Sequence, residues 1–145
     1  MPRMRATLPT IERATFVIFS LGGHRFAAYV EAVERVLRAS RSVAVNATVR
    51  YAGIDVPVLS LEPALVVSAS RSNTSRLLII VTGTRWLAVE VDAVHEVAAI
   101  DAATVQPLES DSSRAYAPTG VRGVFRRADH DVLVLDVARM LEIAS

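Results

Sequence analysis

The stretch FVIFSLGGHRFAAYVEAVERV, from Phe16 to Val36, decides the fold because it occurs twice in the chain. A shift of 61 positions aligns it with LLIIVTGTRWLAVEVDAVHEV, from Leu77 to Val97. Each copy has an apolar run, a glycine turn, a second apolar run and a V-[ED]-A-V segment, a pattern typical of a β-hairpin. An internal repeat indicates two related structural units. The identical pairs are Ile18/Ile79, Gly22/Gly83, Ala27/Ala88, Val30/Val91, Ala32/Ala93, Val33/Val94 and Val36/Val97.

A second, looser match follows the first one along the chain. At a shift of 76, VPVLSL (Val56 to Leu61) aligns with VLVLDV (Val132 to Val137). Two ordinary hairpins could agree by chance, but the shared V-[ED]-A-V segment argues against that. We therefore expect a mostly β fold of two related small β-barrels, which hide their sheet edges by closure. The predicted strands are Phe16–Phe19, Arg25–Val30, Ile54–Leu59, Leu77–Val81, Arg85–Val91 and Val132–Leu135, with a short helix at 136–143 that Asp136 would cap.

Length and composition set the broad class of the protein. The chain has 145 residues, of which 52% are apolar and 21% charged, which suits one packed domain. Cysteine is absent, which excludes a disulfide scaffold, a thiol nucleophile and a zinc–thiolate site. The longest apolar run is far too short to span a bilayer, and the first residues lack the apolar segment of a secretion signal. We expect a cytoplasmic protein without direct membrane insertion.

The basic residues are all arginine: the sequence has 16 of them, no lysine, and a net charge of +1. They are spread along the chain, whereas a nucleic-acid surface would cluster them among aromatic side chains. Codon bias of a GC-rich genome explains them more simply, and no nucleic-acid partner is expected. The alternative is a small arginine-rich β-barrel that binds nucleic acid or a phosphate ligand. Its affinity for nucleic acid would fall steeply between ~50 and 200 mM salt.

Candidate groups for catalysis are few. His24 and His130 fall in predicted turns, and His95 stands beside Glu96 without the spacing of a zinc motif. No nucleophile elbow, phosphate loop or dinucleotide fingerprint is present. An enzyme using His95 and Glu96 would need a pocket that the sequence does not indicate. We therefore expect no catalytic residue, no metal and no cofactor.

The segments VEAVERV (Val30 to Val36) and VDAVHEV (Val91 to Val97) resemble the CheW-like family of chemotaxis coupling proteins. The resemblance extends through IDVPVLSL and GVFRRADHDVLVLDVARML and covers Phe16 to Leu141. It implies a CheW-like fold of two SH3-like five-stranded β-barrel subdomains with a short C-terminal helix, and no catalytic activity. It also implies two partners: the cytoplasmic tip of a methyl-accepting chemoreceptor and the regulatory domain of a CheA-type histidine kinase. The expected organisation is an N-terminal extension at 1–15 and one CheW-like domain at 16–143, with subdomains at about 16–67 and 76–137 and a strand crossover left open.

The resemblance also assigns residues to two surfaces. The receptor-binding groove would be lined by small apolar side chains, which would otherwise only fill the barrels: Val33, Ala88, Val94 and Val97. The kinase-facing surface departs from the family. Arg35 stands where family members carry glutamate. The family's arginine would fall at Ala52, so Arg50 is displaced from that position. Ser60 stands where family members carry aspartate. The segment between Arg38 and Val49 is too short for the family's usual helix. These departures predict an adaptor that binds the receptor, with its kinase coupling weakened or lost.

Overall fold

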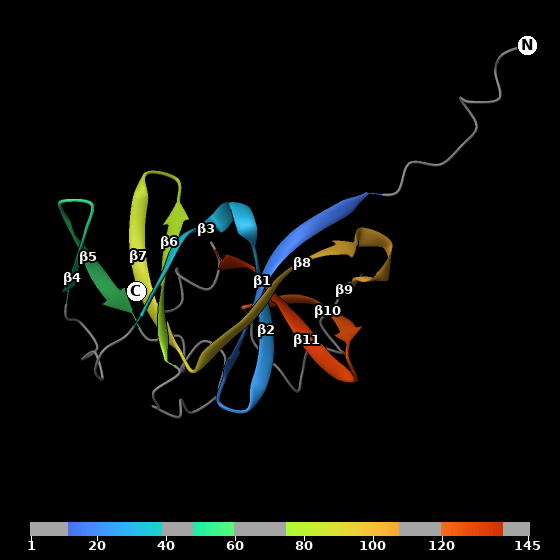
Figure 1. Ribbon diagram of the computed structural model, residues 1–145. Helices are drawn as coiled ribbons and strands as arrows, with labels where there is room; N and C mark the ends of the chain where they lie inside the picture. The colour runs from blue at the N-terminus through green and yellow to red at the C-terminus, as the bar shows by residue number, and fades with distance from the viewer. Residues whose placement is uncertain (1–11, 39–47, 60–74, 108–119, 138–145) are drawn as a thin grey trace, which may run out of the picture.

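The structure is a computed structural model that describes residues 12–38, 48–59, 75–107 and 120–137. Its strands form two sheets that lie side by side in Figure 1. The larger sheet has the order β8-β1-β2-β11-β10-β9. Its strands are β1 (Arg13–Leu21), β2 (His24–Tyr29), β8 (Ala93–Asp101), β9 (Gln106–Pro107), β10 (Val121–Arg127) and β11 (His130–Leu135). The smaller sheet, β3-β6-β7-β5-β4, is built from β3 (Val33–Arg38), β4 (Thr48–Tyr51), β5 (Ile54–Leu59), β6 (Arg76–Thr82) and β7 (Arg85–Val91).

The two sheets do not follow the two halves of the chain. The smaller sheet is made of consecutive strands within residues 33–91, whereas the larger one joins the N-terminal hairpin β1–β2 to β8–β11. Subdomain borders at about 16–67 and 76–137 therefore do not coincide with the sheets, because strands of each half cross to the other. A short 3-10 turn, Val30–Ala32, leads the chain from the larger sheet into the smaller one.

The internal repeat appears as a repeated pattern of strand pairing. In the larger sheet Val134 of β11 lies parallel to Ala27 of β2, and in the smaller sheet Val58 of β5 lies parallel to Ala88 of β7. These two pairs are equivalent under the shifts of 61 and 76 found in the sequence. The edge pairs match as well, including a bulge at the same position: Phe19↔Val94 and Ile18↔Glu96 correspond to Ile80↔Val33 and Ile79↔Arg35. The subdomains are thus related by an approximate internal symmetry.

Three clusters of buried side chains make up the core. One cluster belongs to the larger sheet and includes Phe16 and Ala27, and another belongs to the smaller sheet and includes Ile79 and Ala88. The third, which we call the shared core, contains side chains of both sheets: Phe19, Leu21, Phe26, Ala28, Leu133 and Leu135 from the larger, and Leu78, Ile80, Leu87, Val89 and Val91 from the smaller. The central strands are therefore buried on both faces. That explains their continuous apolar runs, because a strand with one face in solvent would alternate apolar and polar residues.

The mostly β fold expected from the sequence is confirmed, with one difference in strand number. The larger sheet carries a sixth strand, β9, which pairs through only two residues. Gly22 and Gly23 both have positive φ (62° and 84°), which is the backbone of a tight two-residue hairpin turn. The helix expected at 136–143 lies outside the described residues except for Asp136 and Val137. No helix in the described part of the chain is long and apolar enough to cross a membrane.

Candidate functional site

Val33 and Val94, the first two residues assigned to the receptor-binding groove, hold equivalent positions beside the shared core. Val33 begins β3 and Val94 lies near the start of β8, each next to the bulge of its strand. Both side chains pack against the shared core and are half-buried, so each keeps an accessible face. The structure thus brings these two valines to one apolar cluster between the sheets.

Ala88 and Val97 are placed differently. Ala88 is fully buried (0% exposed) with Val56, Val58 and Ile79, in the interior of the smaller subdomain rather than at its surface. Val97 lies on the edge strand β8 and is 60% exposed, as is its repeat equivalent Val36 on β3 at 38%. Two apolar side chains at equivalent edge positions are therefore open to contact from outside.

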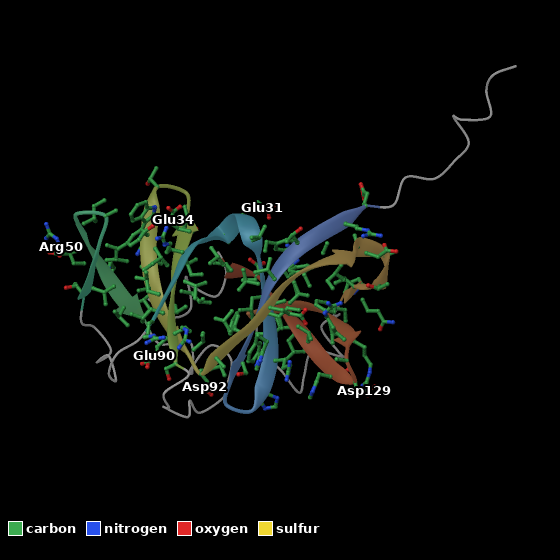
Figure 2. All side chains as sticks on the ribbon, in the orientation of Figure 1. Glu31, Glu34, Arg50, Glu90, Asp92 and Asp129 are labelled. Carbon is green, nitrogen blue, oxygen red and sulfur yellow. The ribbon has the colours of Figure 1, made fainter. Side chains whose placement is uncertain are left out.

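The residues assigned to the kinase-facing surface lie on β3 and on the β4–β5 hairpin. Arg35 is exposed on β3, and Arg50 is exposed on β4, on the far side of the smaller sheet from the larger one (Figure 2). Arg50 Nη1 donates to Asp55 Oδ1 at 3.1 Å across the hairpin. Ala52 sits in the turn with φ of 52°, a left-handed conformation that glycine or asparagine adopts more easily. Ser60 lies outside the described residues.

In each subdomain a side-chain pair links an edge strand to a strand on the opposite side of the sheet order. In the larger one, Arg127 of β10 donates through Nε and Nη2 to the two carboxylate oxygens of Glu96 on β8, at 2.9 and 3.0 Å. The hydrogen bonds between these two side chains lower the pKa of Glu96 and raise the pKa of Arg127. In the smaller one, Tyr51 of β4 donates to Glu34 of β3 at 3.4 Å. Tyr51 is the repeat equivalent of Arg127, and Arg35 that of Glu96.

The charge reversal at Arg35 has a structural counterpart in these pairs. Glu96 is bonded by Arg127, whereas Tyr51, the repeat equivalent of that arginine, bonds Glu34 and not Arg35. No described residue forms a hydrogen bond or ion pair with the Arg35 side chain. Its guanidinium is therefore left to solvent or to a partner protein.

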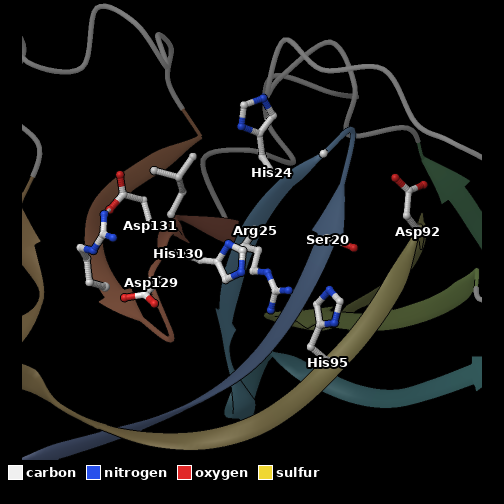
Figure 3. Close-up of a pocket in the computed structure, with 11 residues that line it drawn as sticks. Ser20, His24, Arg25, Asp92, His95, Asp129, His130 and Asp131 are labelled. Carbon is white, nitrogen blue, oxygen red and sulfur yellow. Dashed lines mark hydrogen bonds and ion pairs between the residues drawn. The ribbon is translucent and has the colours of Figure 1, made fainter.

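The histidines gather around one hollow, which the spacing of the sequence did not indicate. The hollow measures about 630 Å³ and lies where the β1–β2 and β10–β11 hairpins approach the start of β8 (Figure 3). Its polar lining includes all three histidines of the chain, His24, His95 and His130. Each comes from a different strand, so only the fold could bring them together. Among the described residues, no three histidine or acidic side chains are grouped so that they could hold a metal ion.

Comparisons with known proteins agree with this architecture. The family model described as "CheW-like domain" matches residues 15–145. Among solved structures, the chain is similar to the scaffolding protein TtCheW from Thermoanaerobacter tengcongensis, with a TM-score of 0.71 and 21% identity. That similarity covers 90% of this chain and 88% of the other. No curated protein matches the sequence.

Proposed function

Because the chain belongs to the CheW-like domain family, we propose that it is a non-enzymatic adaptor of a bacterial chemosensory array in the cytoplasm. The proposal assigns it the cytoplasmic tip of a chemoreceptor as its first partner. It is supported by the family match over nearly the whole chain and by the fold it shares with a protein described as a scaffold. Neither partner binding nor the array requires a cofactor or a metal ion in this proposal.

The observation that carries the receptor proposal is the placement of Val33 and Val94. The two residues are repeat equivalents, yet both pack on the same shared core and keep an accessible face. An apolar surface flanked by two sheets suits a helical hairpin, since helices bind grooves through side chains spaced along one face. Val97 extends this surface along β8 as an exposed apolar contact.

A pair of matched variants tests the receptor proposal. Val97→Asp should weaken binding to a receptor-tip fragment about tenfold or more, because a carboxylate buried without a partner is costly. Val36→Asp is the matched control, since Val36 is also exposed and is the repeat equivalent on the other edge. Both variants should stay folded because both valines face solvent. Equal affinity of Val97→Asp and the unaltered protein would contradict the proposed surface.

Val33→Asp and Val94→Asp extend the same test toward the shared core. These valines are half-buried, so each substitution also destabilises the fold, and a melting curve must accompany each binding assay. We expect reduced receptor binding from the molecules that remain folded. If both variants are folded and bind the receptor tip with full affinity, the groove assignment is wrong.

For the second partner, we propose that coupling to a CheA-type kinase is weakened or lost. Support comes from the exposed Arg35, which has no partner among the described residues at a position where the second repeat carries Glu96. A like-charge contact at an interface can cost several kcal/mol, enough to reduce affinity by orders of magnitude. The protein would then occupy receptor sites without recruiting kinase and so alter the composition of the array.

Titration with the regulatory domain of the cognate kinase tests this second proposal. We expect no binding at micromolar concentrations, and Arg35→Glu should restore some affinity. Arg38→Glu makes the same charge change at another exposed position of β3 and should have little effect. Micromolar or tighter binding by the unaltered protein that Arg35→Glu abolishes would overturn the loss of coupling and indicate an interface adapted to the arginine.

A further inference from the structure

The histidine-lined hollow between the two hairpins has the features of a binding site for a small anion. Five strands contribute polar side chains to it, and Figure 3 shows the Arg25 guanidinium between the imidazoles of His95 and His130. A hollow of about 630 Å³ is within the usual range for small-ligand sites. Its lining consists of Ser20, Gly23, His24, Arg25, Asp92, His95, Arg126, Asp129, His130, Asp131 and Leu133.

The lining carries two guanidinium groups and three carboxylates, and one of the guanidinium groups, that of Arg25, is not bonded to any of the carboxylates. Arg126 donates to Asp131 at 3.1 Å, and Asp92 accepts from the backbone N–H of Gly22 at 2.9 Å. No described residue forms a hydrogen bond or ion pair with the guanidinium of Arg25. Arg25 is also only partly exposed, because it lies on β2 between β1 and β11. A half-buried guanidinium without a bonded partner is suited to a bidentate oxyanion.

The internal symmetry shows that this hollow is particular to the larger subdomain. The repeat equivalents of Arg25, His95 and His130 are Trp86, Glu34 and Ile54. In the smaller subdomain Trp86 packs on Tyr51, with ring centroids 5.3 Å apart, and Tyr51 bonds Glu34. Trp86 therefore takes the place of Arg25, and Glu34 and Ile54 take the places of the two histidines. The combination of a guanidinium with two imidazoles is particular to the larger subdomain, although both subdomains share the same strand arrangement.

We propose that the hollow binds a small tetrahedral oxyanion of the phosphate class, with the Arg25 guanidinium as its main partner. His95 and His130 would donate ring N–H groups to the same anion, and Ser20, which also lines the hollow, would add a hydroxyl. Side chains of this kind supply most phosphate contacts in proteins. This inference does not depend on the adaptor function, because none of the residues that line the hollow is assigned to the receptor-binding groove or to the kinase-facing surface.

Acidity should strengthen this binding. Partial burial, Arg25 and His130 together lower the pKa of His95 and so disfavour its imidazolium form in the free protein. A bound anion favours the imidazolium and raises that pKa, and by linkage the affinity for the anion rises as the pH falls. The groups facing His95 are Arg25 on β2, His130 on β11, and Glu96 on its own strand, the last held by Arg127 of β10. Asp92 and Asp129 also line the hollow and oppose the anion.

Calorimetric titration of the full chain with sulfate and with inorganic phosphate tests the proposal. Sulfate keeps its charge across the relevant range, so its affinity should rise severalfold between about pH 8 and pH 6. Chloride at matched ionic strength controls for general screening, and acetate separates tetrahedral oxyanions from carboxylates. Equal response to chloride and sulfate, or tighter binding of acetate, would overturn the proposal.

Variants locate the site. Arg25→Gln should reduce sulfate affinity about tenfold or more, whereas Arg85→Gln, on the equivalent hairpin of the smaller subdomain, should leave it unchanged. If Arg25→Gln does not fold, His130→Gln on the exposed turn side gives a second variant with an expected severalfold loss. Imidazole NMR signals of His95 and His130 should shift on sulfate addition in the unaltered protein. Unshifted signals, or equal loss of affinity in Arg85→Gln, would contradict the site.

Discussion

Glu96 and Arg35 occupy equivalent positions of the repeat, and the difference between them is a matter of partners as well as charge. Glu96 is held by both donors of Arg127, a bidentate geometry that fixes the carboxylate between β8 and β10. Arg35 faces outward beside a tyrosine–glutamate pair. One subdomain thus uses its charge at this position internally, and the other presents it to its surroundings.

The Glu96–Arg127 pair predicts an acid-sensitive contribution to stability. Because the bonded arginine lowers the folded-state pKa of Glu96, the contribution is present above the ordinary glutamate pKa and is lost as the pH falls through the lowered value. Glu96→Gln should therefore reduce the free energy of unfolding at neutral pH and flatten its decline in acid. Urea unfolding at a series of pH values measures both. Glu31→Gln, at an exposed position, is the control, and an identical acid profile for the two variants would refute the prediction.

At the scale of elements, β9 depends on a single glycine. Gly123 of β10 pairs with Pro107 of β9, and a Cβ at Gly123 would lie 3.0 Å from the carbonyl oxygen of Gln106 and 3.1 Å from Cγ1 of Val105. The first neighbour is backbone, which cannot turn aside as a flexible side chain would. A side chain at position 123 would therefore force β9 away from β10.

Gly123→Ala should separate β9 from β10 at a cost of about 1–3 kcal/mol in the free energy of unfolding. Hydrogen exchange at Gln106 should become faster, while exchange in the central strands keeps its protection. The bulge between Val121 and Gly123 is the place where the strand could adjust. Unchanged stability and unchanged exchange at Gln106 would show that it does adjust.

The central strands were easier to predict from the sequence than the edge strands that pair with them. The apolar runs at Phe16–Phe19 and Leu77–Val81 are long because both faces of those strands are buried, so they stand out in any reading of the chain. β3 and β8 are edge strands with mixed exposure, and neither is among the strands predicted from the sequence. β9 has two residues and no pattern of its own.

The candidate site was predictable only in part, for a related reason. Val33 and Val94 carry a local signal in the V-[ED]-A-V segment, and the structure places both at the shared core. Nothing local distinguishes the interior Ala88 from the exposed Val97, because burial is decided by strands distant in sequence. The hollow lined by His24, His95 and His130 depends on the parallel pairing of β2 with β11, which sequence periodicity does not encode.

For the whole molecule, the strand arrangement predicts that the chain folds as one unit. A break within residues 60–74 separates β3–β5 from β6–β7 and also β1–β2 from β8–β11. Each of the two fragments would then lack strands of both sheets and part of the shared core. Neither can bury enough apolar surface alone to offset its loss of conformational entropy.

Fragments 1–67 and 68–145 should each lack stable structure when isolated and form a one-to-one complex when mixed. Circular dichroism of the separate and combined fragments, with analytical ultracentrifugation, measures this directly. Independent folding of either fragment would show that the hairpins within one half are stable without the strands of the other half, and would contradict the prediction.

The larger sheet combines β1–β2 with the much later strands β8–β11, and this separation in sequence affects folding during synthesis on the ribosome. All strands of the smaller sheet have been made once residue 91 is complete, but the hairpin β1–β2 gains its partner β11 only when residue 135 emerges. At a synthesis rate of ~5–20 residues per second, roughly 5–20 s pass between the completion of β2 and the completion of β11. During that interval the edge of β2 that pairs with β11 has no partner, and such an edge readily pairs with another nascent chain. Polysomes carrying this message should therefore need a chaperone that shields the first thirty or so residues until translation ends.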